Sequence, residues 1–349
     1  MSQKALVLQA KFGSFTVTTV PKPTSALKGE LLVKVQASAL NPVDWKIQEY
    51  GWFVPDDEYP AIMGIDIAGD VEDVGEGVTG FEKGDRVFFS GSFFSKEYAG
   101  HQQFSRISAE IAAKIPTDLS YSQAATIPLG FLTAAVGLYA NEPLGLGLNP
   151  TLASDVKEFS GKTALVIGGS TSVGQYAIQL LRYLGVPNII AYASAHQFSY
   201  LRTLGATTFV DRREVSFLDL PAAIKKVSST AVELVYDAFS SCESQCAGYS
   251  VLSNGGKMVI VLPDEIEGKV EGDGKKIVHA LGSAQPDTHR EFGKRVFETF
   301  PKLIEEGTIV PNRVEDLQNG LEGILDGLKR LRNNEVSGVK LVAHPQETK

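Results

Sequence analysis

The sequence predicts an α/β protein in which a β-rich region precedes a doubly wound parallel sheet. Three observations support this prediction. Residues 1–128 hold short apolar strands joined by glycine turns, the chain from Thr163 onward alternates strands with helices, and a last strand pattern closes the sequence. A length of 349 residues is sufficient for two hydrophobic cores. We therefore expect a first domain from residues 1–128 and 309–349 and a second from residues 129–308.

The β-rich region begins with an alternating, half-polar strand in residues 1–15. Residues 30–39 also alternate apolar and polar side chains, as a half-buried strand does. Residues 67–74 and 85–90 are two more short strands bounded by glycine turns. A helix is expected from Ala124 to Ala140, followed by a loop over residues 142–160 that is rich in Pro, Gly, Leu and Ser.

The second region has the strand and helix alternation of a parallel sheet that is covered on both faces. An amphipathic helix is expected from Leu317 to Leu331, and a final strand from Gly338 to Ala343 is expected to rejoin the β-rich domain. The strands expected in the parallel sheet are 163–168, 188–193, 207–210, 232–237, 257–262 and 276–281.

The segment TALVIGGSTSVG, residues 163–174, predicts a phosphate-binding turn between a strand and a helix. Gly168 and Gly169 allow a tight turn and close approach to a pyrophosphate, and Gly174 allows the helix to pack against the strand. The helix N-terminus adds N–H groups and a positive dipole end. The residues expected to bind a dinucleotide here are Gly168, Gly169, Ser170, Thr171, Ser172, Val173 and Gly174.

The end of the next strand favours NADPH over NADH. An NAD site places an Asp or Glu about 20 residues beyond the turn, whereas this strand ends in YASAHQ, without an acid. Ser194 and Gln197 can donate hydrogen bonds to a 2′-phosphate, and His196 adds charge when it is protonated. Arg212, with Arg213 beside it, follows the third strand and is expected to pair with the same phosphate. Alternatively, these arginines are solvated surface charges and His196 is an ordinary loop residue.

Charge and composition exclude several functions. A net charge of -8 and a pI near 5.3 argue against nucleic acid or an anionic membrane as the main partner. The sequence has no run of 18 apolar residues and no pattern of a secretory signal, so we expect a cytoplasmic protein. Cys242 and Cys246 are four residues apart without other soft ligands nearby, and we interpret them as reduced thiols.

Several ordered motifs resemble the medium-chain dehydrogenase/reductase superfamily over almost the full length. They are NPVDWK at residues 41–46, PAIMGIDIAG at 60–69, GEGV at 75–78, GDRV at 84–87 and VSGVKLV at 336–342. The combination of NPVDWK with GGSTSVGQYAIQL and SAHQF is most similar to the zinc-free enoyl and quinone reductases, in particular the trans-acting enoyl reductases of fungal polyketide pathways. The resemblance implies a GroES-like catalytic domain and a Rossmann cofactor domain.

The resemblance also predicts that zinc is not used. Zinc alcohol dehydrogenases of this superfamily have a Cys where this chain has Asn41, and Gly-His-Glu where it has Gly64-Ile65-Asp66. No lobe of four cysteines is present between residues 90 and 110. Zinc needs three or four N, S or O ligands in a fixed geometry. His101 is the one candidate ligand that persists, and we interpret it as a hydrogen-bonded surface or cleft residue.

The resemblance assigns roles to individual residues. It implies that Lys46 and Thr133 act at the nicotinamide and at the substrate carbonyl, and Tyr50 is a candidate proton donor to the α-carbon. Alternatively, Lys46 is a surface lysine, Thr133 bonds a backbone carbonyl of its own helix, and Asp44 caps a helix. Aromatic residues at 50, 52, 53, 93 and 94 are expected to line an apolar pocket. The further residues expected at the cofactor are Asn41, Asp44, Val261, Leu262 and Lys340.

The expected activity is NADPH-dependent reduction of the C=C bond of an enone, enal or enoyl thioester. A quinone reductase and a non-catalytic NADPH-binding sensor or structural protein are the alternatives. The substrate is either a free small molecule or a chain carried by a polyketide-synthase partner. Either a monomer or a homodimer is compatible with the sequence, because the edge strand at 276–281 either pairs with a second copy or is covered by residues 288–306.

Overall fold

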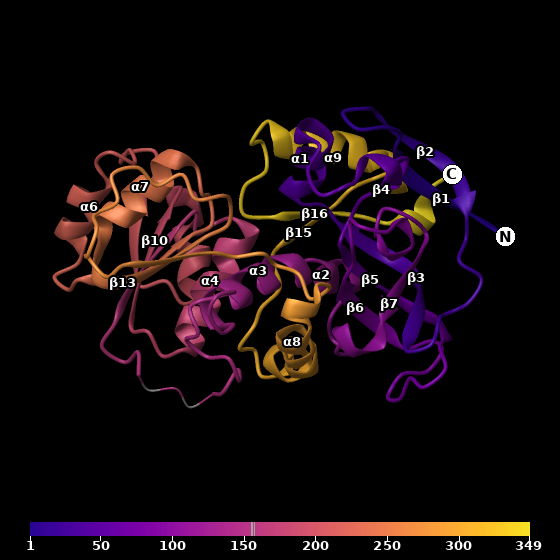
Figure 1. The fold of residues 1–349 in the computed structure, drawn as a ribbon, viewed down its shortest axis with the longest axis horizontal. Coiled ribbons are helices and arrows are strands. Elements are labelled where there is room, and N and C mark those ends of the chain that lie inside the picture. The colour runs from indigo at the N-terminus through magenta and orange to yellow at the C-terminus, as the bar shows by residue number, and fades with distance from the viewer. Residues whose placement is uncertain (155, 157) are drawn as a thin grey trace. The chain divides into compact units, whose positions relative to one another are not determined.

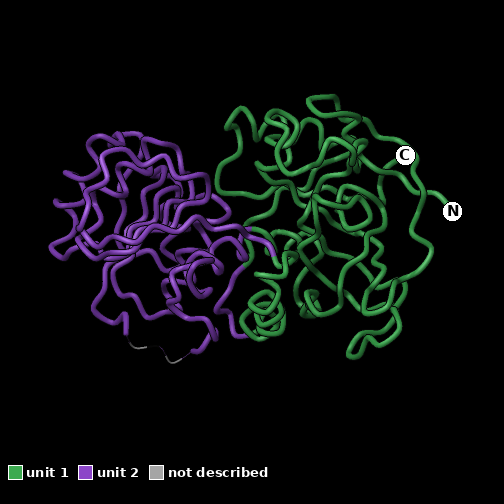
Figure 2. The backbone as a smooth tube through the Cα atoms, in the orientation of Figure 1, with its two compact units in different colours: residues 1–129, 284–305, 311–349 green, residues 130–283, 306–310 purple. Residues whose placement is uncertain are grey.

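The chain folds into two compact units, shown in different colours in Figure 2. The computed structural model describes residues 1–349 with the exception of 155 and 157. Unit 1 contains residues 1–129, 284–305 and 311–349, and unit 2 contains residues 130–283 and 306–310. In the described part of the chain, no helix combines the length and the apolar character that a bilayer span requires.

Unit 2 is built around a six-stranded sheet in which every pairing is parallel. The strand order is β11-β10-β9-β12-β13-β14, so the first strand of this sheet, β9, lies in the middle and later strands are added on both sides. Figure 1 labels two of these strands, β10 and β13. All six strands overlap the predicted ones, and the fold class is confirmed. The strands are β9 (Thr163–Ile167), β10 (Asn188–Ala193), β11 (Thr208–Asp211), β12 (Val232–Asp237), β13 (Leu252–Ile260) and β14 (Lys276–His279).

Helices connect these strands, because a parallel pair needs a crossover that covers a face of the sheet. The strand side chains are buried, among them Leu165, Ile167 and Val235, and they form one core with residues of the crossover helices. The helices are α4 (Ser172–Tyr183), α5 (Phe198–Leu204), α6 (Leu220–Val227) and α7 (Cys242–Val251). This arrangement places the carboxyl ends of β9, β10, β11 and β12 at one edge, where ligands bind in such sheets.

Unit 1 contains the β-rich part of the chain. A seven-stranded sheet has the order β15-β16-β3-β5-β6-β8, with β7 also paired to β3, and a smaller sheet has the order β2-β1-β4. The final strand rejoins this unit as predicted, since Val342 lies opposite Ala39 in an antiparallel pair. The strands are β1 (Ser2–Leu8), β2 (Phe15–Pro21), β3 (Glu30–Ala39), β4 (Ala61–Ile62), β5 (Asp66–Val74), β6 (Arg86–Ser90), β7 (Phe104–Ser108), β8 (Ala112–Lys114), β15 (Val314–Asp316) and β16 (Lys340–Ala343).

The predicted helix from Ala124 to Ala140 is two helices. The first, α2 (Tyr121–Ala125), ends before Pro128, and the second, α3 (Pro128–Tyr139), begins at it. Proline lacks the N–H that a helix interior needs and is tolerated in the first turn, so it starts a new helix here. Residues of α3 from Gly130 onward belong to unit 2.

Two other predicted boundaries are corrected. The helix expected from Leu317 begins later, as α9 (Gly323–Arg332), because Asn319 and Gly320 have φ values of 68° and 57°, which interrupt a right-handed helix. Helix α8 (Asp287–Glu305) belongs to unit 1, although the sequence placed residues 129–308 together in the cofactor domain. Its rings explain this, since Phe297 and Phe300 pack on Phe88 of β6 at centroid distances of 6.4 and 5.3 Å.

Candidate functional site

The turn between β9 and α4 has the geometry that the glycines predicted. Gly168 has φ +71°, which other residues adopt only at a cost. A Cβ on Gly174 would lie 2.2 Å from the carbonyl oxygen of Gly168, so only glycine allows the helix to begin this close to the strand. Thr171 caps α4, because its hydroxyl accepts a hydrogen bond from the Gly174 N–H at 3.0 Å. This turn fits a pyrophosphate at a helix N-terminus.

The structure brings together two of the residues predicted to bind a 2′-phosphate. Ser194 follows β10 and Arg212 follows β11, and these strands are neighbours in the sheet. Arg212 Nε donates a hydrogen bond to Ser194 Oγ at 2.7 Å. His196 and Gln197 lie in the short 3₁₀ turn Ala195–Gln197 directly after Ser194. A hydroxyl and a guanidinium at adjacent strand ends suit a phosphate, and no carboxylate follows β10 to repel it.

Asp237, at the end of β12, organises the next loop and was not predicted from the sequence. Its Oδ1 accepts hydrogen bonds from the N–H groups of Phe239 and Ser240 at 3.0 and 2.8 Å, and its Oδ2 accepts one from the Ser244 hydroxyl at 2.6 Å. The Ser240 hydroxyl in turn accepts from the N–H of Val261, a predicted cofactor residue, at 2.8 Å. A carboxylate that ends an apolar strand, with serines three and seven residues later, is the sequence signal for this role.

Burial raises the pKa of Asp237 to about 6, despite three hydrogen bonds that favour the charged form. A carboxyl with a raised pKa in the folded state stabilises the fold below its unfolded pKa, and this stabilisation is lost as pH rises through about 6. We therefore expect that raising the pH from about 5 to about 8 lowers the free energy of unfolding by about 1 to 2 kcal/mol through the ionisation of Asp237. Denaturant titrations at both pH values should show this loss in the wild type and not in Asp237→Asn; an equal loss in both proteins would contradict it.

Thr133 lies in α3 within unit 2, and its surroundings identify a glycine that the sequence did not single out. The Thr133 side chain is nearly buried. A Cβ on Gly282 would lie 2.0 Å from the Thr133 hydroxyl oxygen, so the chain at residue 282 passes directly over this hydroxyl. Tyr236 of β12 donates a hydrogen bond from its hydroxyl to the Thr133 backbone carbonyl at 3.0 Å. These contacts fix the position of the predicted Thr133 hydroxyl within its own unit.

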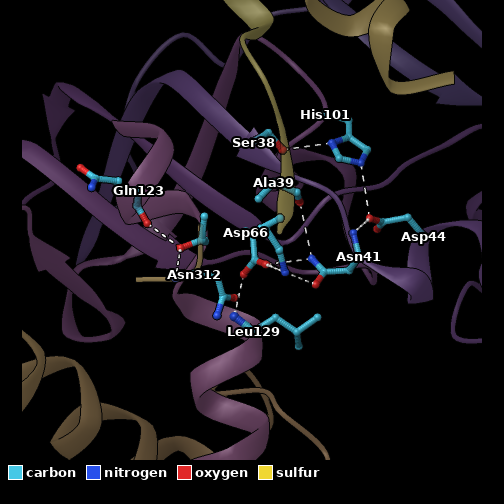
Figure 3. Close-up of polar contacts among 11 residues, drawn as sticks. Ser38, Ala39, Asn41, Asp44, Asp66, His101, Gln123, Leu129 and Asn312 are labelled. Atoms are coloured by element: carbon cyan, nitrogen blue, oxygen red, sulfur yellow. Dashed lines mark hydrogen bonds and ion pairs between the residues drawn. The ribbon is translucent and has the colours of Figure 1, made fainter. Parts of the chain in front are cut away.

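In unit 1, Asn41, Asp66 and Lys340 form a buried polar cluster. Lys340 Nζ donates to Asn41 Oδ1 at 2.5 Å and forms an ion pair with Asp66 Oδ2 at 2.8 Å. Asn41 Nδ2 donates to Asp66 Oδ2 at 2.8 Å, and the N–H of Leu129 donates to Asp66 Oδ1 at 2.6 Å (Figure 3). Asp66 therefore also caps the first turn of α3. The sequence motifs singled out Asp66 only as part of the Gly64-Ile65-Asp66 segment that replaces Gly-His-Glu. They did not indicate its pairing with Lys340, because the two residues are distant in sequence.

A second buried group lies beside this cluster. The Ser38 hydroxyl is 3.0 Å from His101 Nδ1, and His101 Nε2 is 3.7 Å from Asp44 Oδ2 (Figure 3). Asp44 Oδ2 also accepts from the Asn41 N–H at 2.8 Å, which caps the first turn of α1 (Pro42–Tyr50). The helix-cap interpretation of Asp44 is correct. His101 is fully buried, so the expectation of a surface or cleft residue is wrong; its Ser38 and Asp44 neighbours hold it inside.

The residues at the positions of the zinc ligands do not fit a zinc ion. The oxygens of Asn41 and Asp66 already bind an ammonium group, which repels a divalent cation. Ile65, which stands where the zinc enzymes have the His of Gly-His-Glu, offers no ligand atom at all. Among the described residues, no group of three or more His, Cys, Asp or Glu side chains has the geometry for a metal ion.

Lys46 lies on α1 among aromatic rings. Its Nζ is 5.8 Å from the centroid of the Trp45 ring and 6.0 Å from that of Trp52. Burial lowers the pKa of this ammonium below its usual value. Within the described ranges, no carboxylate lies at ion-pair distance from it. Tyr50, at the end of the same helix, is about half exposed and packs between Trp45 and Trp52.

Comparisons with known proteins agree with this geometry. Residues 27–130 match the alcohol dehydrogenase GroES-like domain, and residues 172–270 match the domain described as zinc-binding dehydrogenase. A zinc-type alcohol dehydrogenase-like protein of Schizosaccharomyces pombe is 32% identical, over 97% of this chain and 99% of its own. A trans-enoyl reductase of Alternaria alternata is also 32% identical, over 98% of both chains. The quinone oxidoreductase structure from Coxiella burnetii superposes with a TM-score of 0.73 at 25% identity, covering 98% of this chain and 99% of its own.

A GroES-like unit joined to a parallel sheet with a glycine-rich dinucleotide turn defines the class of two-domain oxidoreductases. The chain belongs to the medium-chain dehydrogenase/reductase superfamily, in the group that includes the fungal trans-enoyl reductases. The resemblance that the motifs indicated is confirmed.

Proposed function

We propose that this protein is a zinc-independent, NADPH-dependent reductase of the C=C bond of α,β-unsaturated carbonyl compounds. The observation that carries the proposal is that the side-chain oxygens of Asn41 and Asp66, two residues of the segments that align with the zinc motifs, are bound to the Lys340 ammonium. In the zinc enzymes of this superfamily, a Lewis acid at the alcohol oxygen assists oxidation, and without one alcohol oxidation becomes difficult at this site. Reduction of an activated C=C bond needs only a hydride donor, a hydrogen-bond donor at the carbonyl and a group that protonates the α-carbon.

The cofactor would be held by unit 2. The turn at residues 168–174 suits its pyrophosphate, and Ser194 with Arg212 suits a 2′-phosphate. The loop that Asp237 organises, with Val261 and Leu262, completes the predicted binding residues of this unit. When bound, the reduced nicotinamide supplies a hydride for the β-carbon of the substrate. An indirect role near the cofactor is left for Asn41, Asp44 and Lys340, because their polar atoms bind one another inside unit 1.

The chain's own residues would handle the charge and the proton. Negative charge develops on the carbonyl oxygen during reduction, and the Lys46 ammonium is a donor without a carboxylate partner in the described residues. The Thr133 hydroxyl is the second predicted donor. Tyr50, with its half-exposed ring, is the candidate that protonates the α-carbon. Full turnover by Tyr50→Phe would assign that proton to water or to another group.

The test is the oxidation of NADPH with an alkenal, a cyclic enone, an enoyl thioester and a benzoquinone, with NADH in parallel. The same protein after exhaustive chelation is the control for zinc. Turnover of a C=C substrate that survives chelation and prefers NADPH supports the proposal. Turnover of the quinone alone would favour the quinone reductase alternative. Activity that is lost on chelation and regained with zinc, or tight NADPH binding without turnover of free or carrier-bound substrates, would overturn the proposal.

Arg212→Leu is expected to weaken NADPH binding by roughly tenfold to hundredfold and to leave NADH binding unchanged. The reason is the loss of a charge-assisted hydrogen bond to the 2′-phosphate, which is worth about 1.5 to 3 kcal/mol. Fluorescence titration with both cofactors measures the change. Arg213→Leu is the matched control, because it removes the same charge from the next residue. A selective loss in Arg213→Leu instead would transfer the role to that arginine.

A further inference from the structure

Five aromatic side chains of unit 1 form a continuous series of ring contacts, two members of which lie near Lys46; we call this series the aromatic frame. The ring centroids of Trp45 and Tyr50 are 6.0 Å apart, and those of Tyr50 and Trp52 are 5.0 Å apart. Phe53 lies 6.3 Å from Trp52 and 6.2 Å from Phe93, on which it stacks with an interplanar angle of 21°. The frame therefore joins its rings through two tilted contacts, one edge-on contact and one stacked contact, all on one unit.

The frame is not a closed core. Tyr50 is 47% exposed and Phe53 is 42% exposed. Contiguous exposed apolar surface on a globular protein marks a contact site more often than isolated exposed residues do. The rings therefore have free surface for a ligand to cover.

The backbone conformation of Phe53 is strained, which indicates that the surrounding structure holds this ring in its position. Its φ is 64°, a left-handed value that is a true outlier for a bulky residue. Such strain persists where the surrounding structure imposes it, and it is frequent at ligand sites. Gly51, at the end of α1, fixes the preceding turn, because its φ is 66° and a Cβ there would meet the side chains of Lys11 and Phe12. The strained backbone keeps the Phe53 ring stacked on Phe93 and partly open to solvent.

Lys46 gives the frame a polar end. Its ammonium lies about equally far from the Trp45 and Trp52 rings, and the described residues provide no carboxylate to pair with it. A carbonyl oxygen of a ligand fits this ammonium, while the atoms conjugated to that carbonyl extend over the rings. Flat π-systems gain stacking interactions on such faces that a saturated chain of the same size does not gain.

We propose that the aromatic frame selects α,β-unsaturated carbonyl substrates whose double bond is conjugated to an aryl ring or a polyene, with Trp52 and Phe53 as the specificity-determining residues. The inference deepens the proposed reductase function and rests on it. Trp52 contacts both the ring of Tyr50 and the ammonium region of Lys46, and Phe53 extends the surface toward Phe93. This selectivity depends on whether the substrate is flat. It can therefore be measured separately from a general preference for apolar chains.

The experiment compares two thioesters that differ only in the tail: trans-cinnamoyl and trans-3-cyclohexylpropenoyl N-acetylcysteamine. Both carry a double bond conjugated to the thioester carbonyl and a six-membered ring, but only in the first is the ring flat and conjugated to that double bond. Because the two differ in intrinsic reactivity, the readout is the ratio of their kcat/KM values in each variant relative to the wild type. We expect Trp52→Leu and Phe53→Leu each to lower this ratio by about three- to tenfold. Trp52→Phe, which keeps a ring, is expected to retain most of it.

Phe81→Leu is the matched control, because it removes a ring on the turn between β5 and β6, outside the frame, where Phe81 contacts Lys114. Its ratio should equal that of the wild type. NADPH affinity and melting temperature report whether each variant is folded. If both thioesters are reduced and the ratio does not change in Trp52→Leu and Phe53→Leu, the inference is overturned and the proposed function remains. If the wild type reduces neither thioester nor any other C=C substrate, both are overturned.

Discussion

Gly174→Ala is expected to weaken NADPH binding by at least about tenfold and to destabilise unit 2 by about 1 to 3 kcal/mol. The added Cβ would lie 2.2 Å from the Gly168 carbonyl oxygen and 3.0 Å from its carbon. Both are backbone atoms of the turn, so no flexible side chain can move aside to relieve the contact. The start of α4 must then shift away from β9, which displaces the N–H groups expected to bind the pyrophosphate.

Gly161→Ala is the control for this substitution. Gly161 precedes β9 in the same unit, has ordinary φ, and a Cβ added there would have no heavy atom within 4 Å beyond its immediate chain neighbours. Alanine at this position should leave affinity unchanged and stability equal or slightly higher. Isothermal titration with NADPH and thermal melting of both variants test the difference. Wild-type affinity in Gly174→Ala would show that the phosphate does not bind at this turn.

The fold of unit 2 follows from local sequence signals. The apolar runs that become β9, β10 and β12 are buried on both faces, and glycine marks the turn after the first of them. Residues that follow adjacent strand ends are brought together by the parallel order alone, which explains why Ser194 and Arg212 were predicted as a pair and are hydrogen bonded.

Contacts between distant segments were not predictable in the same way. The buried pairing of Lys340 with Asn41 joins residues 299 apart, and no local pattern indicates that register. The apolar face of α8 predicts that this helix is buried but not against which sheet, and Phe88 of β6 decides the matter. Gly282 shows the same limit, since its proximity to the Thr133 hydroxyl depends on how the chain returns after β14.

Substitution of Lys46 by methionine is expected to lower kcat/KM by about 10²- to 10³-fold, which is the usual effect of removing one donor to a developing oxyanion. Methionine keeps much of the apolar stem, so packing against Trp45 and Trp52 should persist. NADPH affinity and melting temperature should therefore remain close to those of the wild type. A similar loss in kcat/KM that came with loss of cofactor binding would indicate a role in holding the cofactor instead.

The pH dependence provides an independent test of the same ammonium. Burial lowers the pKa of Lys46 below the usual value of 10.5, so the charged donor is lost at a lower pH than an exposed lysine would lose it. Activity should be full below that pKa and fall as pH rises through it. In Lys46→Arg the guanidinium keeps its charge throughout the range. The alkaline decline of kcat/KM should therefore disappear in Lys46→Arg, even if its activity is lower, and an unchanged decline would assign the titration to another group.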